Sequence, residues 1–344
     1  MIGMTDIAAL IRTLPKAELH VHLEGCITPE QLVSIGERND VTLFASVEAG
    51  TAAYTVSNLD EFLGIFAKAS DVLLYADDFA EVAPAHFDNA TANAVRHVEL
   101  MLDLQAHTTR GVAVKTVFDG LAKAQNYAFN QGLSTSLTVN FMRERNEEEA
   151  FQLLASPESY RSQIIAVGID SAENGHPPRK FSKLFQEVRK MGLQLVAHAG
   201  FEGPPADIEE AVDILRVNRV NRVDHGNRVY ERPELALRLG RLGTAVTVCP
   251  RAEVELGVVT SLPEHPVRRM LADGMRPSLH SDDPAWFGSI TENYIVLAQE
   301  MALTRSEVFQ LVRNSFTIRF LPATALSIYL MEIDAIEQAT FADR

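Results

Sequence analysis

The chain contains few of the residues that mark secreted or membrane-spanning proteins. It has only 2 cysteines in 344 residues, too few for a disulfide framework, so we expect a reducing compartment, the cytoplasm. No run of about 18 apolar residues occurs, so no membrane span is expected. Residues 1–15 lack the basic stretch and apolar core of a signal peptide, which fits a cytoplasmic protein.

Positive charge is also scarce. The chain has 31 Lys and Arg against 46 Asp and Glu, a formal net charge of −15 at pH 7, and no long basic run. Nucleic acid backbones are bound by clustered Lys and Arg, so we expect no nucleic acid polymer as a partner. A small neutral or cationic molecule fits this charge better. The sequence leaves the oligomeric state open.

Apolar residues make up 47% of the chain, enough for a sizeable core, and many lie in short β-branched runs. These runs predict eight strands, at 17–22, 95–102, 134–142, 164–169, 193–198, 220–225, 245–249 and 276–280. Helical patterns such as 179–191, 207–217 and 233–242 alternate with them. Eight strand–helix units predict an α/β fold, a (β/α)₈ TIM barrel, as a single domain over 1–344.

Two helical additions to the barrel are expected. The connection over 23–94 is too long for one crossover helix and has helical patterns at 59–69 and 78–93, so we expect a helical insertion after the first strand. We interpret it as a lid, in which Phe62 and Phe66 contact a flat ligand or belong to the ordinary core. From residue 285 onward we expect a helical C-terminal tail that closes the barrel.

Four metal-ligand types each follow a strand-like run, and the barrel fold demands that the chemistry lie at these strand ends. His20 and His22 share one face of a strand, because side chains alternate with period two. His198 and Asp282 follow two later strands. Three imidazoles and one carboxylate suit Zn²⁺, with Fe²⁺ or Co²⁺ also possible, one ion per chain.

Five segments of the chain, in order, resemble the adenosine/adenine deaminase family of metal-dependent amidohydrolases. They are "PKAELHVHLEG" (15–25), "VGIDSAENG" (167–175), "VAHAG" (196–200), "VDHGNR" (223–228) and "SDDPAWFG" (281–288). The adenine type is the more similar branch, by "HLEG", "LDLQAHTTRG", "FMRERNEEEA" and "EGPP". The resemblance implies a zinc-dependent hydrolytic deaminase of an aminopurine or related amino-heterocycle, as a free base rather than a nucleoside.

The resemblance also implies roles for single residues. The metal ligands are implied to be His20, His22, His198 and Asp282. His225 is implied to take a proton from metal-bound water, which makes it catalytic together with Asp282. Asp283 is implied to accept a hydrogen bond from the ring, and the backbone near Glu173 to face its N3 edge. Glu24 replaces a shorter Asp and is implied to shorten the pocket to suit a free base.

One departure from the family concerns the proton donor. The family has a Glu directly after "HAG", where this chain has Phe201, which can instead stack on a flat ring. Losing a general acid costs about 10²–10⁴-fold in rate. Three interpretations stay open: Glu202 takes over as the acid, the substrate is shifted to one that does not need this proton, or the protein is a metal-binding pseudoenzyme.

The resemblance assigns no role to several other charged residues and histidines. Arg251 and Glu253 put charges at the expected barrel mouth, where Arg251 contacts the substrate or the two form a surface ion pair. We expect His86, His176 and His265 at the surface, away from the metal.

Overall fold

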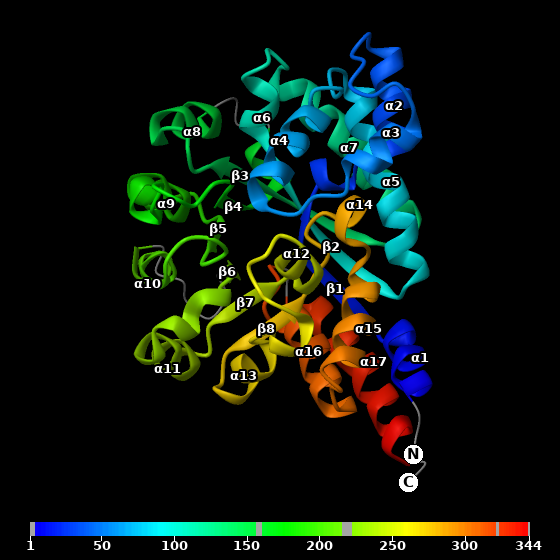
Figure 1. Cartoon of the computed structure of the whole chain (residues 1–344), viewed down its shortest axis with the longest axis vertical. Helices are drawn as coiled ribbons and strands as arrows, with labels where there is room; N and C mark the ends of the chain where they lie inside the picture. The colour runs from blue at the N-terminus through cyan, green and yellow to red at the C-terminus, as the bar shows by residue number, and fades with distance from the viewer. Residues whose placement is uncertain (1–3, 156–159, 215–221, 321–322, 343–344) are drawn as a thin grey trace.

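The computed structural model describes residues 4–155, 160–214, 222–320 and 323–342. Its eight strands run parallel in the order β1 to β8, and helices surround them (Figure 1). The strands are β1 Lys16–His22, β2 Val95–Asp103, β3 Ser134–Met142, β4 Ile164–Asp170, β5 Gln194–Ala199, β6 Arg222–His225, β7 Ala245–Val248 and β8 Arg276–Leu279. The predicted (β/α)₈ barrel is confirmed.

The barrel closes between its last and first strands at the site end. Val21 pairs with Asp282 in an isolated parallel bridge. The amide of His22 donates to the carbonyl of Asp282 at 2.9 Å, and the amide of Asp282 donates to the carbonyl of His20 at 3.1 Å. Closure of the barrel therefore places Asp282 directly beside the two histidines of β1.

The helices fall into an insertion, crossover helices and a C-terminal group. The insertion comprises η1 Glu24–Cys26, α2 Pro29–Arg38, α3 Val47–Ala53, α4 Leu59–Ser70 and α5 Ala76–Ala92. Between later strands lie α6 Leu104–Thr108, α7 Val114–Asn130, α8 Glu147–Leu154, η2 Arg161–Gln163, η3 Pro178–Phe181, α9 Ser182–Lys190, α10 Pro205–Ile214, η4 Asn227–Glu231, α11 Pro233–Leu242, α12 Pro250–Glu255, η5 Leu262–Glu264 and α13 Val267–Ala272. The tail has α1 Met4–Thr13 beside it and comprises α14 Pro284–Phe287, α15 Ile290–Glu300, α16 Arg305–Thr317 and α17 Ala323–Ala342.

The helical tail covers the seam between β1 and β8. From α16, the Ser315 hydroxyl accepts a hydrogen bond from the amide of Ala17 at 3.1 Å. The Asn314 amide group donates to the carbonyl of Pro277 in β8 at 2.7 Å. Because two side chains of one helix hold both strands, α16 fixes the register in which Asp282 meets β1.

Predicted and observed strand ends differ by at most two residues wherever the structure describes them. Residues 220–221 of the predicted sixth strand and 215–217 of a predicted helix lie outside the described residues. No helix in the described part of the chain is both long and apolar enough to cross a membrane.

Candidate metal and active site

Five side chains from four strand ends converge at one end of the barrel. His20 and His22 come from β1, His198 from β5, His225 from β6, and Asp282 follows β8. All five are at least nine-tenths buried. His225 and Asp282 have positive φ angles, of 67° and 64°, a conformation that is costly for residues with a Cβ and that clusters at functional sites.

The spacing of the donor atoms fits a single ion. Nε2 of His20 lies 3.1 Å from Nε2 of His198 and 3.1 Å from Oδ1 of Asp282. Nε2 of His22 lies 3.6 Å from the same Oδ1. Ligands about 2.0–2.2 Å from a tetrahedral zinc are separated by distances of this order. His225 also reaches this cluster: its Nε2 lies 4.0 Å from Oδ2 of Asp282, and His20, His198, His225 and Asp282 each offer a donor atom within 4.8 Å of the others.

The imidazoles of His20 and His22 are held in the neutral form that metals bind. Burial lowers the pKa of His20 well below its usual range. Burial and the neighbouring His198 lower the pKa of His22 to about 4. The ring nitrogen of His20 that points away from the cluster, Nδ1, lies 3.1 Å from the buried hydroxyl of Thr247. That hydroxyl in turn donates a hydrogen bond to Asp224 at 2.5 Å. Such outer contacts orient metal-binding histidines.

His225 has a buried carboxylate partner, Glu253. Nδ1 of His225 lies 3.0 Å from Glu253 Oε1, and Glu253 Oε2 lies 2.6 Å from Nε2 of His265. Burial favours the neutral ring of His225, but the hydrogen bond with Glu253 and the charge of Asp282 outweigh it and raise the pKa to about 9. The surface position expected for His265 was wrong, and so was the alternative in which Glu253 forms a surface ion pair with Arg251, because both side chains are buried and hydrogen-bonded to each other.

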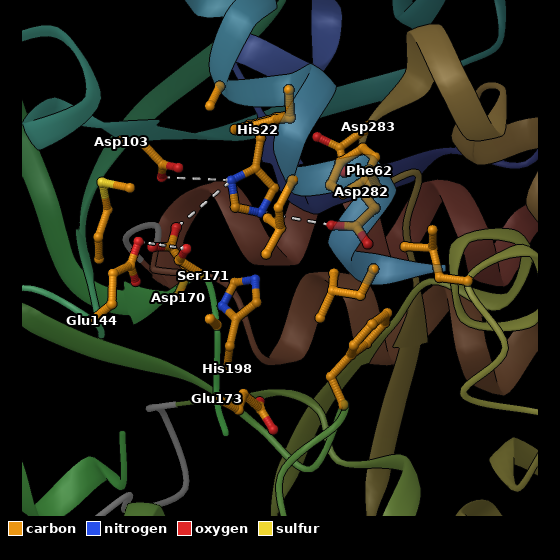
Figure 2. Close-up of a pocket in the computed structure, with 18 of the residues that line it drawn as sticks. His22, Phe62, Asp103, Glu144, Asp170, Ser171, Glu173, His198, Asp282 and Asp283 are labelled. Carbon is orange, nitrogen blue, oxygen red and sulfur yellow. Dashed lines mark hydrogen bonds and ion pairs between the residues drawn. The ribbon is translucent and has the colours of Figure 1, made fainter. Parts of the chain in front are cut away.

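Two further acids, Asp103 and Asp170, face His22 from the side opposite Asp282 (Figure 2). Their nearest oxygens lie 3.9 and 3.8 Å from His22 Nδ1. Burial and the neighbouring Glu24 raise the pKa of Asp103 to about 8, and burial beside Asp103 raises that of Asp170. Sequence reasoning did not single out Asp103, although its place at the end of β2 was the available signal.

A cavity of about 240 Å³ opens above this cluster. Phe62 and Phe66 of α4 line it together with Phe201, and all three are less than a tenth exposed. All three side chains therefore belong to the core and also line the cavity. For Phe62 and Phe66, a place in the core is compatible with contact to a ligand in the cavity. The charged lining residues in the described chain are all acidic apart from the histidines: Asp103, Glu144, Asp170, Glu173, Asp282 and Asp283.

Asp283 projects into the cavity beside the metal ligand Asp282 (Figure 2). Its Oδ1 is buried and has no hydrogen-bond partner in the described structure. A Cβ on Gly25 would lie 2.0 Å from that oxygen and 2.7 Å from the Asp283 Cα. Gly25 therefore has to be glycine for Asp283 to occupy this position.

Three side chains predicted to contact the ligand or to act on it do not line the cavity: those of Glu24, Arg251 and Glu202. Glu24 accepts hydrogen bonds from the amide of Asp103 and from His107 and does not line the cavity. Arg251 pairs with Glu255, at 3.3 Å, rather than with Glu253. Glu202 accepts the amide of Glu173 at 2.8 Å, together with two N–H groups of the next residue, so neither Glu202 nor that amide is directed at a ligand.

The comparisons with known proteins agree with one another. The family model described as "Adenosine deaminase" matches residues 15–336. The chain is 43% identical to adenine deaminase of Caulobacter vibrioides over 317 residues, 91% of each chain. It is 43% identical to that of Cupriavidus pinatubonensis over 343 residues, covering 98% of this chain and 97% of the relative. The crystal structure of adenine deaminase from Arthrobacter aurescens superposes with a TM-score of 0.90 at 36% identity, covering 94% of this chain and 99% of the other. The chain therefore belongs to the adenosine deaminase family.

Proposed function

We propose that the protein hydrolyses the exocyclic C–N bond of a free aminopurine base, with adenine as the first candidate, and releases ammonia. The observation that carries this proposal is the convergence of His20, His198 and Asp282 within 3.1 Å contacts at the floor of a cavity walled by aromatic rings. Relatives 43% identical over almost the whole chain are named adenine deaminase, which supports the same reaction here.

One divalent metal fits the donor set, with His20, His22, His198 and Asp282 as its ligands. We assign the third nitrogen to His22 rather than His225, because His22 lies closer to Asp282 and has the lower pKa. Zn²⁺ suits three imidazoles and a carboxylate best, and Fe²⁺ or Co²⁺ can also be bound. When bound, such a metal lowers the pKa of a water molecule so that hydroxide is available near neutral pH.

The protein's own groups then handle protons and orientation. A divalent cation bound beside His225 would favour its neutral form, in which Nδ1 donates to Glu253 and Nε2 has a lone pair. In that form His225 would take the proton of the attacking water on Nε2 and return it to the departing amino group. The free Oδ1 of Asp283 accepts a hydrogen bond from a ring N–H. Phe62, Phe66 and Phe201 flank the ring and exclude water.

The charge of the cavity supports a free base. No Lys or Arg lines it in the described chain, whereas six acidic residues do. A phosphate group would find no Lys or Arg to pair with there and several carboxyl groups beside it, so the lining disfavours nucleotides.

The proton donor is the unusual part of the proposal. Phe201 stands in the cavity wall with its ring centroid 4.5 Å from that of His225. Glu202 is held by the loop after β4 and is not positioned to protonate a ring. We therefore expect slow turnover of adenine, and faster turnover of a related amino-heterocycle that needs no proton from this position.

An ammonia-release screen tests the proposal. Protein reconstituted with Zn²⁺ is assayed on adenine, alkylated adenines, other aminopurines, pterins and the corresponding nucleosides and nucleotides. We expect release from at least one free base, none from nucleotides, and loss of activity in His225→Ala with metal content unchanged. Zinc-loaded, folded protein that releases no ammonia from any of these rings would contradict the proposal, as would a fully active His225→Ala variant.

A further inference from the structure

The side chain of Glu253 is the buried acid whose contacts point most directly to a role. It belongs to α12, which follows β7, and it is fully buried. Its Oε1 accepts the amide of Cys249 at 2.9 Å and lies 3.0 Å from Nδ1 of His225. Its Oε2 lies 2.6 Å from Nε2 of His265. Glu253 does not line the cavity, so it can affect a ligand only through His225.

The hydrogen-bond pattern around His265 fixes which nitrogen carries its proton. The amide of Val267 donates to Nδ1 of His265 at 3.1 Å, and a backbone amide can only donate. Nδ1 is therefore an acceptor, and Nε2 carries the proton that is donated to Glu253. His265 comes from the segment after η5, so a second part of the chain holds the carboxylate.

The same reasoning fixes the form of His225. An ionised carboxylate only accepts hydrogen bonds, and burial without charge compensation would favour a protonated acid. Glu253 already receives hydrogen bonds from the amide of Cys249 and from Nε2 of His265, and these donors favour the ionised carboxylate despite its burial. Nδ1 of His225 must then carry a proton, which leaves Nε2 as the nitrogen directed at Asp282, 4.0 Å away.

We propose that Glu253 and His265 are positioning residues of the reaction: they hold His225 with Nδ1 protonated and its Nε2 aimed into the cavity. Without Glu253, the imidazole can take the other tautomer, which has no lone pair on Nε2 for a water proton. The inference rests on the proposed function, in which His225 carries that proton. The arrangement assigns a role to two residues that do not touch the substrate.

Four variants test the proposal on the best substrate of the ammonia screen. Glu253→Gln keeps the shape but cannot accept from both histidines; we expect kcat to fall on the order of 10²–10⁴-fold, with KM and metal content unchanged. His265→Leu removes the second donor and should cost about 10–100-fold. His265→Gln keeps an N–H near the Nε2 position and should restore most of the loss. Glu264→Gln, at an exposed acid next to His265, should behave as wild type.

A merely structural role predicts a different pattern. It would lower the melting temperature or metal content together with activity, and His265→Gln would not restore kcat. A folded, metal-loaded Glu253→Gln variant with kcat within about threefold of wild type would overturn the proposal, since loss of the orienting group should cost far more.

A second measurement does not depend on turnover. Two-bond ¹H–¹⁵N NMR spectra of zinc-loaded, ¹⁵N-histidine-labelled protein report which ring nitrogen is protonated, and His225→Ala assigns the signal. We expect a protonated Nδ1 in His225; an unprotonated Nδ1 would overturn the positioning role. If the wild type shows this tautomer but releases no ammonia from any ring, the proposed function fails while the arrangement of Glu253 stands.

Discussion

Replacing Phe201 with glutamate should convert the protein into a faster adenine deaminase. Phe201 follows β5, is 6% exposed and lines the cavity beside His225. In the proposed function it occupies the place from which a carboxylic acid protonates the ring as water attacks. Phe201→Glu puts such an acid back on the same loop.

The surroundings decide whether the new acid carries its proton. Burial raises the pKa of the nearby Asp103 to about 8, and no Lys or Arg of the described chain lines the cavity. A glutamate here should therefore be protonated near neutral pH, which is the form that donates. General acids contribute about 10²–10⁴-fold, so kcat for adenine should rise by a factor in this range. Burying the polar group should cost about 1–3 kcal/mol of stability.

The assay compares kcat for adenine in wild type, Phe201→Glu and Phe201→Gln, all zinc-loaded. Phe201→Gln is the matched control, because its amide has similar size and hydrogen-bonding capacity but cannot give up a proton. We expect a gain only in Phe201→Glu. Equal rates in the two variants, or a rate below that of wild type in Phe201→Glu, would refute the reasoning about the missing acid.

Three further predictions concern the metal, the second candidate acid and a buried ion pair. His198→Ala should lose most of the bound zinc in metal analysis while the far-UV circular dichroism is retained. Glu202→Gln should leave kcat for adenine unchanged, whereas a fall on the order of 10²-fold would show that Glu202 is the acid. Burial raises the pKa of Glu99, but Arg222, His97 and the amide of Phe320 together outweigh it and lower the pKa to about 2. The ionised carboxylate therefore stabilises the fold above about pH 4.5, and this stabilisation is lost as the pH falls through 2. In urea unfolding, Glu99→Gln should therefore cost about 3 kcal/mol at pH 7 and progressively less towards pH 2; a cost independent of pH would contradict this.

Much of the fold could be predicted because each strand is marked locally. The apolar runs that end in His22, Ile169, His198 and His225 are short and bounded by helical patterns, and the observed strands follow them within two residues wherever the structure describes them. Parallel strands in a closed barrel end on one side, so polar residues at their ends had to meet. The contact between β1 and Asp282 follows from closure alone.

The surroundings of the site could not be predicted in the same way. His265 and His86 look like surface residues in a local pattern, but they are buried against carboxylates from other elements, Glu253 of α12 for His265 and Glu18 of β1 for His86. Glu24 likewise turns to His107 instead of the cavity. A charged side chain is buried only where a distant partner compensates it, and a single sequence does not show that partner.

The most direct test of the whole account measures ammonia release from free aminopurine bases by the same protein with and without its metal. We expect bound metal to approach one zinc per chain, ammonia release from at least one base, loss of release on chelation, and recovery on adding zinc. Ammonia release that is unaffected by complete removal of the metal would contradict the assignment of His20, His22, His198 and Asp282 as the centre of the reaction.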